Sequence, residues 1–323
     1  MRRSAANAPT EQMRATDEVA PGILLIDKPE GPTSHDVVAE VRRSVGTRRV
    51  GHTGTLDPFA SGLLILCIGK ATRLVEYFHL LPKRYEATLV LGRETDTDDR
   101  TGRGTAESDA WRELDDETVV AATEARCGQQ SQVPPDYSAR RIEGRRAHQR
   151  VRAGEKVELA PAPVIVHSIR VLEWKPPELS IDVTVSTGTY VRALARDLGR
   201  DLGCGAHLDV LRRTAIGPFD VDDALPTSER GAPHPGSDVP ARILAPAEAL
   251  GWLPRRELTA AELTEISHGR AVAAEEVDDP RLPGPWDGTA ADGPILLVRD
   301  GDLIGVARRD EGMLQPVKVL HAS

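Results

Sequence analysis

Residues 51–62 of the chain, GHTGTLDPFASG, are followed directly by the apolar run LLILCI at residues 63–68. A short apolar run that ends at a glycine, here Gly69, predicts a buried strand. The polar stretch before it therefore predicts a loop that carries a carboxylate, Asp57, to the end of a core strand. Pro58 restricts the backbone of Asp57 to extended conformations. Asp-Pro and Thr-Gly pairs also begin ordinary turns, so a simple turn is the alternative interpretation.

Length and composition predict a soluble protein of two domains. The chain has 323 residues, of which 40% are apolar and 28% charged, within the ordinary range for globular proteins. No apolar stretch reaches the roughly 20 residues of a membrane span, and the N-terminus lacks the apolar core of a secretory signal. The three cysteines are far apart in the sequence, which predicts neither a zinc site nor a disulfide framework. We expect a cytoplasmic protein that makes no membrane contact.

The charge is distributed unevenly along the chain. The net charge of −9 argues mildly against a nucleic-acid partner. Between residues 140 and 156, however, seven basic side chains face only two acidic ones, Glu143 and Glu155. The basic residues are Arg140, Arg141, Arg145, Arg146, Arg150, Arg152 and Lys156. A local basic patch is what phosphate would contact, although a solvated helix face remains the other interpretation.

The pattern along the chain predicts an α+β protein. We expect a disordered tail at residues 1–20, a first domain at 21–225, a linker at 226–244 and a small second domain at 245–323. In the first domain, strands are predicted at 22–27, 63–68, 83–92, 164–174, 179–185 and 206–214, with helices at 34–45, 111–126 and 190–202. Residues 93–104 are expected to form an acidic loop. In the second domain we expect a helix at 260–268, an insert at 275–294, a hairpin at 295–308 and a last strand at 316–320.

Several side chains besides Asp57 are candidates for chemistry. Tyr85 and Tyr190 stand next to basic residues, and such pairs can stack a base while holding its phosphate; a buried core tyrosine is the alternative. Arg192 begins a helix and is either solvated or the ion-pair partner that Asp57 lacks. His52 can act as an acid, a base or a hydrogen-bond donor, or merely close a turn. No phosphate-binding loop or dinucleotide fingerprint is present, so we expect no nucleotide cofactor. The absence of clustered Cys and His residues leads us to expect no metal.

A resemblance to a known family joins these observations. GHTGTLDPFASGLL (51–64) resembles the catalytic motif of TruB-type pseudouridine synthases, which modify the T-loop of tRNA. Six further strings resemble motifs of the same family and occur in the family's order along the chain: LLIDKPEGPTSHDVV (24–38), KRYEA (83–87), RETDTDDRTG (93–102), PPDYSA (134–139), STGTYVRALARDLG (186–199) and GCGAHLDVLRRTAIGPF (203–219). The resemblance covers about residues 22–222. Residues 245–323 resemble, much more loosely, a PUA-type RNA-binding domain.

The resemblance implies a fold and an activity. The fold would be a catalytic domain with a mixed, largely antiparallel central sheet flanked by helices, joined to a PUA-like, β-rich domain. The activity would be conversion of uridine to pseudouridine at position 55 of the tRNA T-loop, without a cofactor. The T-arm of tRNA would be the partner, and the protein would act as a monomer without an obligate protein partner.

The resemblance also implies roles for individual residues. Asp57 would be the catalytic nucleophile on a flipped-out uridine, Tyr85 would stack on its uracil, and Arg192 would pair with Asp57. The nucleotide or the RNA would be contacted by His52, Tyr190, Leu211, Arg145 and Arg146. The motif loop would be supported by Lys28 and Pro29. The family often has an aromatic residue where this chain has His148, which leaves no stacking role assigned there.

Two alternatives fit the same residues. One is an RNA-binding protein whose catalytic site is inactive, using the basic patch and the C-terminal domain. The other is a guide-RNA-dependent relative that modifies ribosomal RNA together with accessory subunits. The intact set of Asp57, Tyr85 and Arg192 argues against the first, and an assay of the single protein on unmodified tRNA separates the second.

Overall fold

The computed structural model describes residues 19–138, 141–142, 145–146, 150, 159–234, 236–279 and 293–320; at 141–142 and 145–146 it describes the backbone alone. The expected disordered tail, residues 1–20, lies outside the described residues except at its last two positions. Most of the basic run at 140–156 and most of the expected insert at 275–294 also lie outside them.

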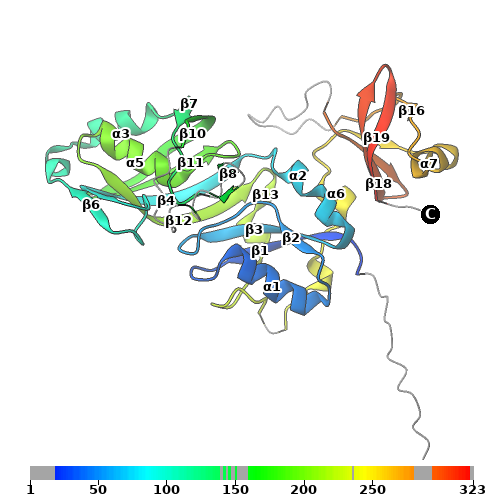
Figure 1. The fold of residues 1–323 in the computed structure, drawn as a ribbon, viewed down its shortest axis with the longest axis horizontal. Coiled ribbons are helices and arrows are strands. Elements are labelled where there is room, and N and C mark those ends of the chain that lie inside the picture. Colours follow the sequence, from blue (N-terminus) through cyan, green and yellow to red (C-terminus); the bar gives the residue numbers. More distant parts are fainter. Residues whose placement is uncertain are drawn as a thin grey trace, which may run out of the picture.

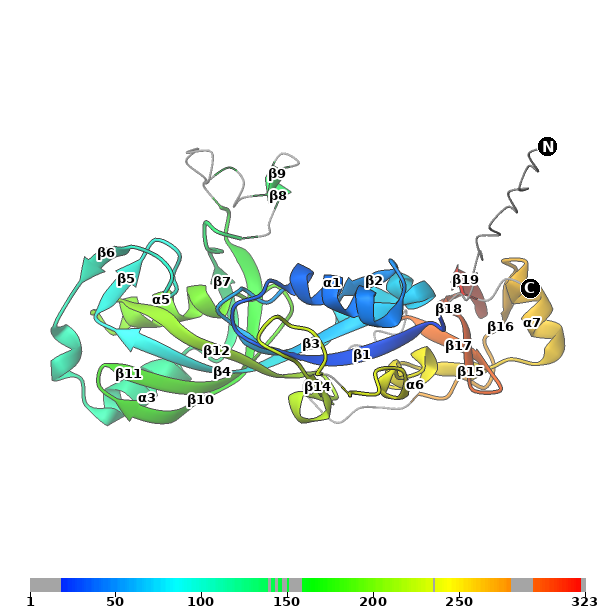
Figure 2. The same cartoon turned by 90° about the horizontal axis from the view of Figure 1, so that it is seen from below.

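The first domain is built on one ten-stranded sheet (Figures 1 and 2). The strands run in the order β14-β1-β3-β12-β4-β11-β10-β7, with β2 beside β3 and β13 beside β12. They are β1 (Gly22–Lys28), β2 (Val50–His52), β3 (Ser61–Ile68), β4 (Lys83–Leu91), β7 (Gly128–Gln132), β10 (Ala162–Lys175), β11 (Glu178–Val185), β12 (Ala206–Ile216), β13 (Phe219–Asp220) and β14 (Leu225–Pro226). Two pairs, β1 with β14 and β3 with β12, are parallel and the others antiparallel. The mixed, largely antiparallel sheet is thus as predicted.

Helix α1 (Ser34–Val45) shows how local sequence sets an element's limits. Thr33 caps its N-terminus in a reciprocal capping box with Asp36, and Gly46 ends it in the left-handed region at φ 69°. The apolar face of the helix, including Val37 and Val41, packs against β1 and β3 in one of the cores. The predicted helix and both of its ends are confirmed.

The two halves of the sheet meet where β3 runs parallel to β12. Only Ser61 and Gly62 pair across this junction, with Arg212 and Arg213. Gly62 has φ 105°, and a Cβ there would lie 2.3 Å from the carbonyl oxygen of Arg213. The close approach therefore requires glycine at this position. The glycine that ends the 51–62 stretch thus joins the halves of the domain directly beside the loop that carries Asp57.

Helices cover the other half of the sheet. The helix α5 (Val191–Asp201) packs on β12 and β4, with Leu194 and Leu198 fully buried. The predicted helix at 111–126 divides into a 3-10 turn, η2 (Ala110–Glu113), and α3 (Asp116–Glu124), because Asp115 accepts a hydrogen bond from Thr118 N and begins a new helix. Three further short helices of this domain are η1 (Gly69–Leu74), α2 (Val75–Phe78) and η3 (Val221–Asp223).

Two short hairpins lie off the main sheet. The expected acidic loop at 93–104 forms one of them in part, with β5 (Arg93–Thr95) paired to β6 (Gly104–Glu107). The loop prediction was therefore wrong at its ends, where the turn between Thr95 and Gly104 lets the flanking residues pair. The second hairpin, β8 (Arg141–Ile142) and β9 (Arg145–Arg146), stands away from the sheet beyond β7 (Figure 2).

The C-terminal domain is a five-stranded sheet in the order β15-β17-β18-β19-β16 (Figure 1). Its elements are β15 (Arg255–Glu257), α7 (Ala260–Ser267), β16 (Val272–Ala273), β17 (Ile295–Arg299), β18 (Asp302–Asp310) and β19 (Met313–Val319). The predicted hairpin at 295–308 is confirmed, since β17 pairs with β18. It turns at Asp300 and Gly301, which both have positive φ, 51° and 85°.

The two domains share a hydrophobic core. Leu296, Val306 and Leu320 of the C-terminal domain belong to the same buried cluster as Ile23 and Leu63 of the sheet. This continuity fixes the small domain against the end of the large one rather than leaving it tethered.

The segment between the domains is not a free linker. Residues 226–244 include η4 (Pro240–Arg242) and are followed by α6 (Pro246–Ala249). Val239 is buried and Ile243 packs against the α1 core, while Leu244 and Ile23 exchange backbone hydrogen bonds of 2.8 and 2.9 Å. Its Pro, Gly and Ser content was misleading because a few apolar residues in such a segment suffice to dock it. None of the helices in the described segments is long and apolar enough to cross a bilayer.

Candidate active site

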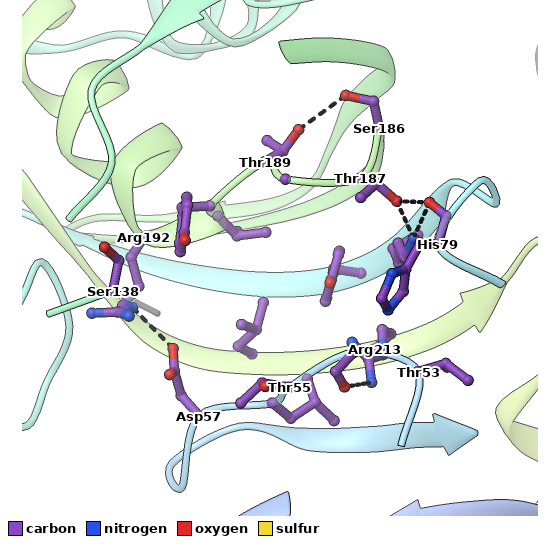
Figure 3. Close-up of a pocket in the computed structure, with 18 of the residues that line it drawn as sticks. Thr53, Thr55, Asp57, His79, Ser138, Ser186, Thr187, Thr189, Arg192 and Arg213 are labelled. Carbon is purple, nitrogen blue, oxygen red and sulfur yellow. Dashed lines mark hydrogen bonds and ion pairs between the residues drawn. The ribbon is translucent and has the colours of Figure 1, made fainter. Parts of the chain in front are cut away.

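A cavity of about 310 Å³ lies where the 51–62 loop, β4, β12 and the start of α5 meet (Figure 3). Asp57 lines it together with Tyr85, Tyr190, Arg192 and Leu211. The structure thus brings together, from four separate segments, five residues that the sequence singled out. Also in the lining are Thr53, Gly54, Thr55, Leu56, His79, Lys83, Tyr137, Ser138, Ser186, Thr187, Gly188, Thr189, Val191 and Arg213.

The loop that carries Asp57 is held from beneath by two buried side chains. Lys28, at the end of β1, is fully buried, and its Nζ donates hydrogen bonds to the carbonyl oxygens of Pro29 at 2.8 Å and Ala60 at 2.6 Å. Ser34, at the start of α1, bonds both the N–H and the carbonyl oxygen of Leu56, at 2.9 and 3.1 Å. These contacts hold residues on both sides of Asp57, and the supporting role of Lys28 stays a prediction.

Lys28→Met is expected to weaken this support. The carbonyl oxygens of Pro29 and Ala60 lose a shared charged donor, and a buried acceptor left unsatisfied costs about 1–3 kcal/mol. Burial already lowers the pKa of Lys28 to about 8, while the nearby charge of Asp57 raises it, so part of this loss is offset by no longer burying an ammonium group. We expect a lower urea midpoint in equilibrium unfolding; an unchanged midpoint would show that Lys28 does not hold the loop.

Arg192 forms the ion pair with Asp57 that the sequence left open. Its Nε lies 3.0 Å from Oδ2 of Asp57 (Figure 3), and the arginine side chain is almost fully buried. Nη1 donates to the carbonyl oxygen of Thr97 at 2.9 Å and Nη2 to that of Tyr137 at 3.0 Å. The guanidinium is thus held in a single orientation by neutral oxygens on one side, and it presents its remaining nitrogen to the carboxylate.

A second carboxylate, Asp99, lies on the other side of Arg192. Its Oδ2 is 3.5 Å from Nη1 of Arg192, and the residue is buried. Its Oδ1 accepts hydrogen bonds from Thr97 Oγ1 at 2.8 Å and from both N and Oγ1 of Thr101, at 2.9 and 2.6 Å. Asp99 therefore helps to hold the guanidinium of Arg192 at Nη1, while Nε faces Asp57. The sequence did not single it out, because a carboxylate in an acidic turn is ordinarily solvated.

Opposing effects act on the pKa of Asp57. Burial raises it above the ordinary value of 3.8, and the charges of Arg192 and Lys28 counteract that rise. The side chain keeps 38% of its surface exposed because it faces the cavity, while the cavity walls still remove water from around it. The result is a carboxylate in a partly dry site with one fixed cation beside it, an arrangement that suits a nucleophile or a base.

Three other cavity residues, Tyr85, Tyr190 and Leu211, supply aromatic and apolar surfaces. Tyr85 on β4 and Leu211 on β12 are buried members of one core cluster. Tyr190 stands immediately before α5, and its backbone is fixed by the side chain of Gln132, which accepts from Tyr190 N at 2.9 Å and donates to its carbonyl oxygen at 3.1 Å. Flat and apolar surfaces next to an ionised carboxylate match the needs of a site that holds a base beside its sugar.

His52 is the candidate that the structure places apart from the cavity. It is not among the lining residues, and its ring packs edge-on against His35, with ring centroids 5.3 Å apart. Burial, the largest cause, lowers its pKa to about 4, so the ring is neutral at physiological pH. Its Nδ1 is buried with no hydrogen-bond partner among the described residues. Contact between His52 and a nucleotide therefore stays a prediction.

Arg145 and Arg146 form β9, the strand that stands off the sheet. Their side chains lie outside the described residues, as do most residues of the basic run. Their contact with RNA stays a prediction. Two other cavity residues, Lys83 and Arg213, carry charge. The sequence drew attention to Lys83 only as one of the basic residues next to Tyr85, and it gave Arg213 no role.

The chain matches known family models and proteins over most of its length. Residues 42–191 match the N-terminal domain of the TruB family pseudouridylate synthases, and residues 192–229 match the tRNA pseudouridylate synthase B C-terminal domain. A protein of Thermobifida fusca is 42% identical over 94% of this chain and 100% of its own length; one of an Arthrobacter species is 43% identical over 94% and 97%. Both relatives are named tRNA pseudouridine synthase B.

Solved structures share the fold at lower identity. A chain in a Cbf5-Nop10-Gar1 complex matches with a TM-score of 0.68 and 22% identity, over 94% of this chain and 86% of that one. A chain in an H/ACA ribonucleoprotein bound to a substrate RNA containing 2′-deoxyuridine matches with a TM-score of 0.66 and 22% identity, over 93% and 85%. The sequence relatives, at more than 40% identity over nearly the whole chain, decide the family. The chain belongs to the TruB family of pseudouridine synthases.

Proposed function

We propose that the chain converts uridine to pseudouridine at position 55 of the tRNA T-loop, with Asp57 as the nucleophile on a flipped-out uridine. The observation that carries the proposal is the Asp57 carboxylate, 3.0 Å from Arg192 in a cavity that Tyr85, Tyr190 and Leu211 also line. The printed names of the relatives, tRNA pseudouridine synthase B, support the choice of tRNA as substrate.

The reaction fits a site in which one carboxylate lies beside aromatic and apolar side chains. The C1′–N1 bond breaks and its electron pair leaves with the uracil. The base then rotates and rejoins the sugar through C5; C5 loses a proton and N1 gains one. There is no net redox change and no group donor. Asp57 acts on the sugar either by bonding to C1′, as in retaining glycosidases, or by removing the C2′ proton. Both routes need the carboxylate ionised, and Arg192 favours that form.

The walls of the cavity have their own part in the reaction. The target uridine must leave its stack before Asp57 can reach the sugar, at a cost of a few kcal/mol. Stacking of the uracil on Tyr85 returns about 1–3 kcal/mol of that cost. The same contact holds the detached base in the cavity while it turns. Leu211 and Tyr190 then exclude water, which would otherwise intercept the activated sugar.

The C-terminal domain is assigned to RNA binding. Its small, sheet-rich form is consistent with a PUA-like domain, and the core that it shares with the catalytic domain fixes its orientation. A domain held rigidly at one end of an elongated sheet can extend the RNA contact beyond the cavity. In this proposal the chain acts on tRNA as a monomer, with no obligate protein partner.

Release of tritium from C5 tests the proposed function. A T-arm RNA hairpin labelled with tritium at C5 of its uridines is incubated with the purified chain alone. Because C5 loses its proton when it bonds to C1′, we expect release of one tritium for each target uridine. Release that depended on a guide RNA or an added protein would favour a guide-dependent enzyme. Binding without any release would favour an RNA-binding protein with an inactive site.

Replacement of Arg145 and Arg146 by alanine is expected to weaken RNA binding through lost phosphate contacts. Each phosphate contact contributes about 0.7–0.9 to the slope of log K against log salt concentration. The double variant should therefore show a slope shallower by up to about 1.8. Fluorescence anisotropy across a salt series measures this slope. An unchanged slope would show that the basic run is a solvated helix face and does not contact phosphate.

A further inference from the structure

The cavity has a second end that the proposed chemistry does not use. Figure 3 shows Asp57 and Arg192 at one end, and Thr187 and His79 at the other. Lys83 belongs to this second end because its Nζ hydrogen-bonds both Thr187 Oγ1 and the carbonyl oxygen of His79. Strand β12 adds Arg213, which faces the cavity between the two ends.

Lys83 and Arg213 are deeply buried, with 7% and 2% of their surfaces exposed. The partners of Lys83 Nζ are neutral oxygens, those of Leu81, His79 and Thr187. Arg213 donates from Nε to the carbonyl oxygen of Leu63 at 2.7 Å and from Nη2 to that of Gly54 at 3.2 Å. These contacts satisfy donors without supplying any negative charge.

No carboxylate of the described residues balances these two cations. Neither forms an ion pair with a described acid, and the only acidic residue in the described lining is Asp57, which already pairs with Arg192. Burial of a cation without an anion is costly. The pKa of Lys83 reflects this: burial, and to a lesser extent the charge of Arg213, lower it to about 7. An anion at this end would relieve the repulsion between the two cations.

A further polar group at this end has no partner. Thr53 lines the cavity and is 2% exposed, and its Oγ1 forms no hydrogen bond to any described residue. A buried hydroxyl without a partner calls for an explanation, and a ligand that accepts its proton is one. Two cations and one hydroxyl that is free to donate would bind a negatively charged oxygen better than the neutral edge of a base.

We propose that this second end of the cavity binds a backbone phosphate of the RNA, one that flanks the flipped-out uridine. The inference rests on the proposed function, because it takes Tyr85 as the surface on which the uracil stacks. Arg213 pairs directly with Tyr85 across β4 and β12. Lys83 lies two residues before Tyr85 on the same face of β4, roughly 6.8 Å along the strand. A base on Tyr85 therefore keeps its own sugar–phosphate backbone within reach of both cations.

A hairpin with a single neutral linkage tests the phosphate contact. T-arm RNAs are prepared with one methylphosphonate linkage, placed either on the 5′ or on the 3′ side of the target uridine. Lys83→Met should raise the Kd of the unmodified RNA about tenfold, the effect of losing one charge-assisted hydrogen bond. One of the two methylphosphonates should raise the Kd of the wild-type protein by a similar factor and leave that of Lys83→Met unchanged.

Lys83→Arg and Lys175→Met serve as matched controls. The first keeps a cation at the site and should recover most of the affinity. The second removes an exposed lysine that pairs with Glu173 on the surface and should change neither Kd nor its dependence on the linkage. Thermal unfolding of each variant shows whether the fold is kept. Lys83→Arg provides the decisive comparison should the methionine variant be unstable.

The pH dependence of binding gives an independent readout. Lys83 is charged below a pH of about 7 and neutral above it, so the advantage of the wild-type protein over Lys83→Met should fade as the pH rises through that value. The groups that face it are His79, whose pKa is lowered from 6.5 mainly by burial, and Arg213. His79 is therefore already neutral above pH 7 and does not produce this change.

Two results would overturn the phosphate site. In the first, each methylphosphonate, on the 5′ or the 3′ side, raises the Kd of Lys83→Met by the same factor as it raises the Kd of the wild-type protein. In the second, Lys83→Met lowers kcat with no change in Kd, which would place Lys83 against the detached uracil. Failure of the proposed function is distinguishable from both, because it would appear as absent tritium release by the wild-type protein.

Discussion

Asp57→Asn is expected to abolish turnover while leaving RNA binding nearly intact. The amide has the shape of the carboxylate but neither bonds to C1′ nor accepts the C2′ proton. The expected loss in kcat is on the order of 10⁴-fold or more, the scale at which enzymes lose activity with their nucleophile. Single-turnover tritium release and fluorescence anisotropy on the same T-arm RNA measure the two effects separately.

The fold should tolerate this substitution. Burial raises the pKa of Asp57, so at neutral pH its ionised form costs stability rather than adding to it. Arg192 keeps a buried counter-ion in Asp99, 3.5 Å from Nη1. We therefore expect a melting temperature equal to or above that of the wild-type protein. Turnover retained by a folded Asp57→Asn variant would remove Asp57 from the chemistry.

Arg192→Met is expected to reduce turnover by about 10²- to 10³-fold, the scale of losing one preorganised charged group. The acid side of the pH–rate profile tests the cause. In the wild-type protein kcat/KM falls as the pH drops through the pKa of Asp57, because the protonated carboxyl is inactive. Without Arg192 that pKa rises further above 3.8, so the fall should begin at a higher pH.

Two further variants make this result interpretable. Arg192→Met leaves Asp99 buried without its cation and is expected to lower stability by about 3–5 kcal/mol, so Arg192→Lys, which keeps the charge, is measured beside it. Arg200→Met, on the same helix but more than half exposed and paired with Glu94, serves as the control. If Arg192→Met loses affinity and turnover equally, and the fall of kcat/KM at low pH begins at the same pH as in the wild-type protein, then Arg192 is only a phosphate contact.

The sequence predicted elements well where local chemistry decides them. The capping box at Thr33 and the glycine at Gly46 determined both ends of α1. The alternation of Leu179 to Val185 and the Asp300-Gly301 turn led to correctly placed strands. Each of these signals depends on a few neighbouring residues, so no knowledge of the tertiary structure was needed.

Contacts between distant segments could not be predicted in this way. Asp57 and Arg192 are 135 positions apart; the residues alone left Arg192 either solvated or paired with Asp57, and the resemblance to a family favoured the pair. Asp99 was missed because nothing local indicates that a carboxylate in an acidic turn is buried. Gly62 belongs to the quoted 51–62 stretch, but its contact with Arg213 across the β3–β12 junction is visible only in the folded sheet.

The polar composition of a segment was the least reliable guide. Residues 226–244 contain enough Pro, Gly and Ser to predict a linker, yet Val239, Ile243 and Leu244 dock it against the catalytic domain. The same docking leads into the core shared by the two domains. Three well-placed apolar side chains outweighed the average character of the segment.

The most direct test of the account is a map of pseudouridine across an entire tRNA. Unmodified tRNA is incubated with the purified wild-type chain or with Asp57→Asn, and every uridine is then examined for conversion. The account predicts pseudouridine at position 55 of the T-loop with the wild-type protein and none with the variant. Conversion at a different uridine, or equal conversion by the variant, would contradict it.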